Sequence, residues 1–114
     1  MLTRDAAIEV VKSFVHDVES TGVRLQKAVL FGSYAQNRQS EWSDIDLALV
    51  SEGFSGFGFE DKQPFARIIC QKPYSIIHIK TYQSSYFDAG DPFIDEIKRT
   101  GIVVFSLDKQ RIHE

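Results

Sequence analysis

The sequence contains a single cysteine, Cys70, and no apolar run that is long enough to cross a bilayer. One cysteine excludes an internal disulfide, and its place in the apolar stretch 68–70 predicts a small buried residue rather than a nucleophile. The first ten residues lack the charged-then-apolar pattern of a signal peptide. We therefore expect a cytoplasmic protein with no membrane partner.

An excess of basic side chains is also missing. The 16 Asp and Glu residues outnumber the 13 Lys and Arg residues, which gives a net charge of −3 and a pI of about 5.6. A protein that binds nucleic acid generally presents a basic face, so we expect no general nucleic-acid binding. The length of 114 residues, 43 % of them apolar, suits one domain with a modest core, placed at 1–106, and a polar tail at 107–114.

Apolar residues recur with helical or strand periods along most of the chain. These periods predict helices at 3–20, 61–71 and 92–100 and strands at 27–31, 45–50, 74–82 and 102–106. A brief helix or turn is expected at 34–38 and a single turn at 84–87. Thr3 is the expected N-cap of the first helix, and Asp91 followed by Pro92 is expected to start the last one.

Two short motifs stand where predicted strands end and begin. Gly32-Ser33 ends one strand, and Asp44 and Asp46 open the next, on one face of it. Two adjacent carboxylates repel each other unless a cation lies between them, and their hard oxygen atoms suit Mg²⁺ or Mn²⁺. Gly32 lets the backbone approach a ligand closely, and Ser33 is expected to open a helix whose N–H groups can receive phosphate.

Each motif alone has an ordinary structural explanation. A Gly-Ser pair is usually a turn, and an Asp-x-Asp pair is usually a solvated strand edge. Their combination, with apolar strands on the correct sides and a spacing that fits one short helix, indicates phosphoryl or nucleotidyl transfer.

The stretch from Gly32 to Asp46 resembles the Gly-Ser-x10-Asp-x-Asp motif of the nucleotidyltransferase superfamily with the DNA polymerase β palm. It is most similar to the minimal nucleotidyltransferase (MNT) domain proteins of that superfamily, and the similarity covers nearly the whole chain. The resemblance implies an α/β (α+β) fold in which helices flank a small mixed β-sheet of about four strands. It also implies that Gly32 and Ser33 hold the phosphates of ATP, and that Asp44 and Asp46 bind Mg²⁺, or Mn²⁺.

Three further positions bear on the expected site: Ser43, Asn37 and His78. Ser43 either caps the turn or touches a phosphate, and the cap is favoured. Asn37 stands where relatives commonly have glycine, and it tolerates a left-handed backbone better than other residues. The family's third carboxylate is replaced by His78, which strand parity places on the same face as the two aspartates. A carboxylate from Glu52, Glu60 or Asp61 could replace it only from a glycine-rich loop that is poorly suited to hold a ligand.

His78 changes the expected chemistry because imidazole brings no negative charge and is a poor ligand for Mg²⁺. It is expected to act as the general base for the acceptor hydroxyl, to bind a softer metal, or to mark a degenerate site that binds without turnover. The third of these readings, with impaired or absent activity, is slightly favoured, because the third carboxylate carries much of the charge stabilisation.

The resemblance implies two competing functions. In the first, the protein is the antitoxin of a toxin–antitoxin pair and transfers AMP from ATP to a hydroxyl group of a helical (HEPN-type) toxin. In the second, it neutralises or assembles with that partner by binding alone. Transfer to a small molecule is disfavoured because the chain has no room for a substrate domain, and a homo-oligomer is left open.

A loop with three glycines and three phenylalanines, at 51–59, is predicted to lack regular structure. Phe54, Phe57 and Phe59 either fold back onto the core or present an exposed apolar patch to a base or a protein partner.

Overall fold

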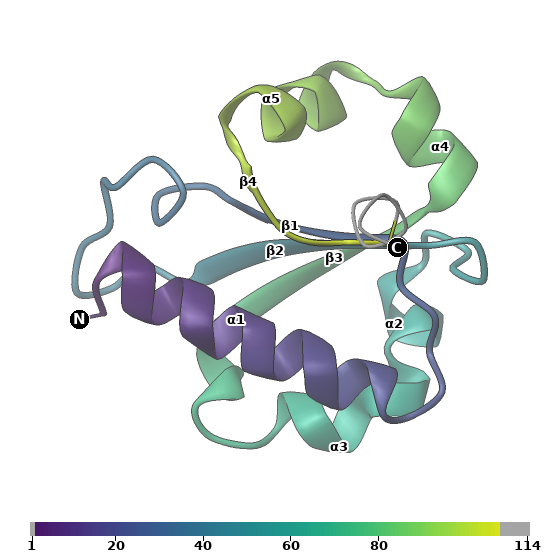
Figure 1. The fold of residues 1–114 in the computed structure, drawn as a ribbon, viewed down its shortest axis with the longest axis horizontal. Coiled ribbons are helices and arrows are strands. Elements are labelled where there is room, and N and C mark those ends of the chain that lie inside the picture. Colours follow the sequence, from purple (N-terminus) through teal and green to yellow (C-terminus); the bar gives the residue numbers. More distant parts are fainter. Residues whose placement is uncertain (1, 108–114) are drawn as a thin grey trace.

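The computed structural model describes residues 2–107, and its centre is a four-stranded sheet with the strand order β3-β2-β1-β4 (Figure 1). The strands are β1 (Lys27–Phe31), β2 (Ile45–Ser51), β3 (Ile77–Gln83) and β4 (Ile102–Ser106). β1 pairs antiparallel with β2 and β4, whereas β2 and β3 run parallel. The predicted mixed sheet of about four strands flanked by helices is therefore confirmed.

One face of the sheet is covered by α1 (Arg4–Glu19), which crosses it in Figure 1. Thr3 caps this helix as predicted, since its Oγ1 accepts a hydrogen bond of 3.1 Å from the N–H of Ala6. The apolar stripe of α1 packs on the inward side chains of the strands, which include Leu30, Leu47 and Ile79. This cluster forms the larger of two cores and fixes which strand residues must point the other way.

The opposite face is covered by α4 (Ser84–Ala89) and α5 (Pro92–Thr100), which lie above the sheet in Figure 1. A smaller core forms here from alternate strand residues and three helix residues: Val29, Ala48, Val50, Phe87, Ile94 and Ile97. The Asp91 side chain caps α5, accepting 2.7 Å from the N–H of Ile94, as predicted. Because these helices cover only part of the face, the ends of β2 and β3 that begin each strand remain accessible on this side.

The single helix predicted at 61–71 is wrong. The segment instead forms α2 (Gly58–Asp61), the 3-10 turn η1 (Gln63–Phe65) and α3 (Ala66–Ile69). Pro64 explains the break, because it lacks an N–H and its ring disfavours a helical conformation in the residue before it. Cys70 follows the end of α3 and is exposed, so its predicted burial is also wrong.

Two other boundaries differ from expectation. The third strand begins at Ile77 rather than at residue 74, because the 3-10 turn η2 (Tyr74–Ile76) precedes it. The turn predicted at 84–87 extends to the six residues of α4. Apart from Leu107, the predicted polar tail lies outside the described residues, and no helix within residues 2–107 is both long and apolar enough to span a bilayer.

Candidate functional site

The site lies at one end of the sheet, where β1 ends and its neighbours β2 and β3 begin. In the strand register, Phe31 at the end of β1 stands opposite Asp46 on β2, and Asp46 stands beside His78 on β3. Gly32 follows Phe31 directly. β1 ends where the parallel strands β2 and β3 begin, so the glycine-serine corner, the acidic pair and the histidine converge on one patch.

Gly32 and Asp46 lie against each other. Gly32 has a φ of +76°, and a Cβ atom added to it would collide with Oδ2 of Asp46 and lie 3.1 Å from its Cγ. Only glycine accepts this backbone conformation readily and leaves space for the carboxylate. The two motifs predicted to meet are therefore in contact.

The carboxylate of Asp46 is held in an unfavourable environment for its charge. Burial raises the pKa of Asp46, and the negative charge of the exposed Asp44 raises it further, while the contact with His78 lowers it. Residues Ile45 and Leu47 are fully buried on the other face, which confirms the predicted alternation. A cation between Asp44 and Asp46 would relieve both the desolvation and the repulsion.

His78 points to the same side as the acidic pair. Its Nδ1 lies 3.3 Å from Oδ1 of Asp46, and its side chain is 65 % exposed. Its neighbours Ile77 and Ile79 are buried, so the strand parity inferred from the sequence is correct. The contact orients the imidazole, and the ring remains reachable from solvent.

The segment after Gly32 is a hydrogen-bonded turn, which is one of the two forms predicted at 34–38, and Ser33 does not open the expected helix. The N–H of Gln36 donates to the carbonyl of Gly32 and that of Arg38 donates to the carbonyl of Ser33, at 3.2 and 2.8 Å. Asn37 has a φ of +58°, the left-handed conformation that its side chain tolerates. The N–H groups of Ser33, Tyr34 and Ala35 are not among the donors that close this turn.

Ser43 closes a second turn just before the acidic pair. Its Oγ accepts 2.9 Å from the N–H of Ser40, and its own N–H donates 3.1 Å to the carbonyl of Ser40. This geometry agrees with the favoured interpretation of Ser43 as a cap. The cap sets the direction in which the chain enters Asp44.

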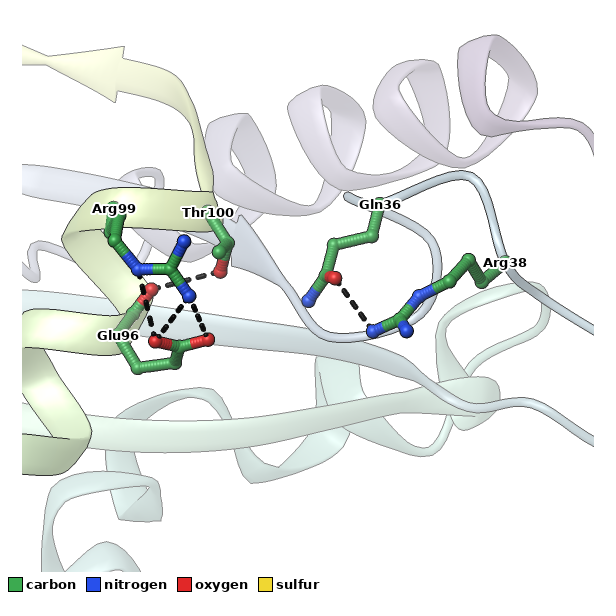
Figure 2. Close-up of polar contacts among 5 residues, drawn as sticks. All are labelled: Gln36, Arg38, Glu96, Arg99 and Thr100. Carbon is green, nitrogen blue, oxygen red and sulfur yellow. Dashed lines mark hydrogen bonds and ion pairs between the residues drawn. The ribbon is translucent and has the colours of Figure 1, made fainter.

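A pocket of about 350 Å³ adjoins this patch and extends below α5. It is lined by Phe31, Gly32, Gln36, Asp46, His78, Lys80, Phe93, Glu96, Ile97 and Thr100. Figure 2 shows three of these lining residues with their partners: Gln36 with Arg38 in the turn, and Glu96 and Thr100 with Arg99 on α5. Site and pocket share Gly32, Asp46 and His78, so a molecule bound at the patch can reach into the pocket.

The sequence analysis did not identify the residues of α5 that line this pocket. Phe93, Glu96, Ile97 and Thr100 follow the i, i+3, i+4, i+7 spacing of one helix face. That spacing could have identified the face, but not that it packs beside Asp46. Asp61, a suggested substitute for the third carboxylate, instead hydrogen-bonds Thr81 further along β3, at 2.7 Å.

The two carboxylates, Asp44 and Asp46, fit one hard divalent cation. Among residues 2–107, no three His, Cys, Asp or Glu side chains gather into a preformed metal site. Mg²⁺ is commonly bound by one or two carboxylates together with substrate phosphates and waters, and Asp44 and Asp46 can supply that share. The residues therefore fit an ion that arrives with a nucleotide better than a permanently held pair of ions.

The family model described as polymerase beta, nucleotidyltransferase, matches residues 15–110, which include every residue of the patch. The chain belongs to this nucleotidyltransferase family. A nucleotidyltransferase relative from Methanocaldococcus jannaschii, named as a candidate protein adenylyltransferase, is 29 % identical over 105 residues, which cover 85 % of this chain and 97 % of that one.

Two solved structures share the nucleotidyltransferase fold. A candidate nucleotidyltransferase from Sulfolobus solfataricus superimposes with a TM-score of 0.68 at 19 % identity, covering 93 % of this chain and 86 % of that one. A chain from the crystal structure of a toxin–antitoxin with AMP-PNP superimposes with a TM-score of 0.57 at 17 % identity, covering 87 % and 76 %.

Proposed function

We propose that this nucleotidyltransferase transfers AMP from ATP to a hydroxyl group of a partner protein, and that a divalent cation is required. The observation that carries the proposal is the convergence of Gly32, Asp46 and His78 at the ends of three adjacent strands. Family membership supports nucleotidyl transfer, and the name of the Methanocaldococcus relative supports adenylyl transfer to protein.

The reaction forms one phosphorus–oxygen bond and breaks another. The acceptor oxygen bonds to the α-phosphorus of ATP, and the bond between that phosphorus and the α–β bridging oxygen breaks. Pyrophosphate leaves with the electron pair of the broken bond, and the acceptor proton passes to a base. Asp44 and Asp46 would hold Mg²⁺ or Mn²⁺, which supplies charge neutralisation for the phosphates. The backbone at Gly32 and Ser33 would position the phosphates.

His78 is the group within this patch that can take the acceptor proton. Its exposed ring lies beside Asp46, and an imidazole nitrogen is the commonest proton acceptor in general base catalysis. Its contact with the Asp46 carboxylate fixes the orientation of the ring. In this role, His78 is a base and not a metal ligand. The two carboxylates would then hold one ion.

We further propose that the protein acts as the antitoxin of a toxin–antitoxin pair, with a helical (HEPN-type) toxin as the acceptor. The similar fold found in a toxin–antitoxin with AMP-PNP supports this assignment. The second candidate function, neutralisation by binding alone, is favoured by one specific observation: the patch offers two carboxylates where the family has three.

One labelling experiment separates the two functions. The protein is mixed with α-labelled ATP, Mg²⁺ or Mn²⁺, and the helical protein encoded beside it, and label on the partner is measured. Transfer is expected, with a loss of at least about 100-fold in Asp44→Asn and Asp46→Asn, because charge stabilisation at the phosphates is removed. If a protein that carries both Asp44→Asn and Asp46→Asn still neutralises the partner's toxicity, the binding-only function is favoured.

Substitution of His78 gives the second comparison. If His78 is the base, His78→Asp loses transfer, whereas His16→Asp, which changes an exposed histidine on α1, does not. If His78→Asp instead creates or raises transfer, the natural site is degenerate, and the binding function replaces the enzymatic one.

A further inference from the structure

The pocket below α5 has aromatic and polar walls that the patch itself lacks. Phe31 and Phe93 meet edge to face, with centroids 5.9 Å apart and an interplanar angle of 90°, and Phe93 is 48 % exposed. The ammonium group of Lys80 lies over the ring of Phe93, 5.0 Å from its centroid. Aromatic walls of this kind suit a flat heterocycle, since every base has a π-face.

On the turn side of the pocket, Gln36 offers a hydrogen-bond donor. Its Oε1 accepts 2.6 Å from the guanidinium of Arg38, so the amide oxygen is already engaged. This bond also fixes the amide orientation, because a guanidinium can only donate. Figure 2 shows the amide nitrogen directed away from Arg38, towards the α5 side.

On the α5 side, Thr100 offers an acceptor. Its hydroxyl donates 2.8 Å to the carbonyl of Glu96, so the remaining capacity of Oγ1 is to accept. The neighbouring Glu96 carboxylate is engaged by Arg99, whose Nη2 lies 2.6 and 2.7 Å from its two oxygens and whose Nε donates at 3.2 Å (Figure 2). Gln36 and Thr100 thus present one donor and one acceptor across the same pocket.

We propose that Gln36 and Thr100 recognise the adenine base: the Gln36 amide donates to a ring nitrogen, and Thr100 Oγ1 accepts from the exocyclic amino group. This inference rests on the proposed nucleotide-binding function and names its base-specificity residues. Adenine carries an acceptor nitrogen next to an amino donor, whereas guanine and hypoxanthine carry an oxygen acceptor in place of that amino group. Guanine, with its N1–H and amino group, is best recognised by a carboxylate. In this pocket, the carboxylate of Glu96 is already engaged by Arg99.

The test compares ATP with ITP, which differ at the purine edge and share ribose and triphosphate. Dissociation constants are measured by calorimetry in Mg²⁺, on the full chain without partner. ATP is expected to bind at least about tenfold more tightly than ITP, because a mismatched edge leaves polar groups unpaired. The ratio of the dissociation constants for ITP and ATP is expected to fall towards one in Gln36→Glu and in Thr100→Val. Gln36→Glu keeps the acceptor for Arg38.

Matched controls separate base recognition from general damage. Gln71→Glu adds the same charge at an exposed position, and Thr21→Val removes a hydroxyl that likewise donates to a helix carbonyl, that of Val18 at 2.6 Å. Both controls should keep the wild-type preference for ATP. Equal binding of ATP and ITP by the wild type, or an undiminished preference in both pocket variants, would overturn the inference while the proposed function stands. No binding of either nucleotide would overturn both.

Discussion

Gly32 is the residue at which backbone conformation and site chemistry meet. Its left-handed φ of +76° is costly for any residue with a Cβ atom, and that atom would also meet the Asp46 carboxylate. Gly22 provides a comparison within the same chain. It also has a positive φ, +97°, but a Cβ atom there would meet nothing within 4 Å.

We expect Gly32→Ala to lower the free energy of unfolding by about 2–4 kcal/mol, from backbone strain together with the displacement of Asp46. Gly22→Ala should cost about 1–2 kcal/mol, from strain alone. Urea titrations measure both losses. Nucleotide binding should disappear in Gly32→Ala and persist in Gly22→Ala. Equal losses of stability, with binding intact in both, would show that Gly32 does not hold Asp46 in place.

Residue-level prediction succeeded where the information is local. The contact of Gly32 with Asp46 follows from the motif, and the direction of His78 follows from strand parity. The roles of these residues remain predictions. The sequence could not show that Thr100 and Gln36 face one pocket, since their positions depend on how α5 packs over the sheet.

At the scale of elements, one buried carboxylate organises the loop between β2 and α2. Asp61 is 7 % exposed and accepts from the N–H and Oγ of Ser55, the N–H of Gly56 and the Oγ1 of Thr81, at distances of 2.7–3.0 Å. Burial by itself raises the pKa of Asp61, but the hydrogen bonds from Ser55, Thr81 and Gly56 together outweigh it, so the pKa lies below its usual value.

Asp61→Asn is expected to lower the free energy of unfolding by about 2–3 kcal/mol at pH 7, because an amide nitrogen would then face a backbone donor. A folded pKa below the unfolded one means that ionised Asp61 stabilises the fold above pH 3.8, and that this stabilisation is lost as the pH falls through the folded pKa. In denaturant titrations, the stability difference between wild type and variant should therefore narrow as the pH falls below 3.8.

The exposed Asp88 provides the control for this pH series. Asp88→Asn should follow the wild type at every pH. A difference between wild type and Asp61→Asn that stays constant down to pH 2 would contradict the assigned role of the Asp61 charge.

The same loop shows why elements were predicted unevenly. The strand bounds at 27–31 and 102–106 match the structure, because short apolar runs between turn residues identify strands locally. The helix expected at 61–71 failed, since Pro64 breaks it and the Asp61 side chain serves the preceding loop instead. One of the hydrogen bonds to Asp61 comes from Thr81, twenty residues away, and the spacing of apolar residues does not reveal that contact.

At the scale of the whole molecule, the two ends of the sheet differ in character. The patch formed by Gly32, Asp46 and His78 lies where β2 and β3 begin, and the phenylalanine loop follows the other end of β2. A strand of seven residues spans about 20 Å. In the loop, Phe54 is buried, whereas Phe57 and Phe59 are 70 % and 83 % exposed. Phe54 therefore folds back onto the core, Phe57 and Phe59 are exposed, and contact of this pair with a base or a partner stays a prediction.

This separation predicts that partner binding and nucleotide binding can be altered independently. Exposed aromatic side chains contribute strongly to protein interfaces, so Phe57→Ser together with Phe59→Ser should weaken binding of the helical partner at least about tenfold. The affinity for Mg²⁺-ATP should stay unchanged, since neither residue lines the pocket beside Asp46. Calorimetry with each ligand measures the two effects.

Trp42 supplies the matched comparison at the other end of the molecule. It is 89 % exposed and lies two residues before Asp44 in the sequence. If the partner is anchored on Phe57 and Phe59, its acceptor hydroxyl must reach about 20 Å along the sheet, and Trp42→Ser should affect transfer more than binding. If Trp42→Ser abolishes partner binding and the phenylalanine pair has no effect, the partner is anchored at the patch itself, and the exposed loop has another role.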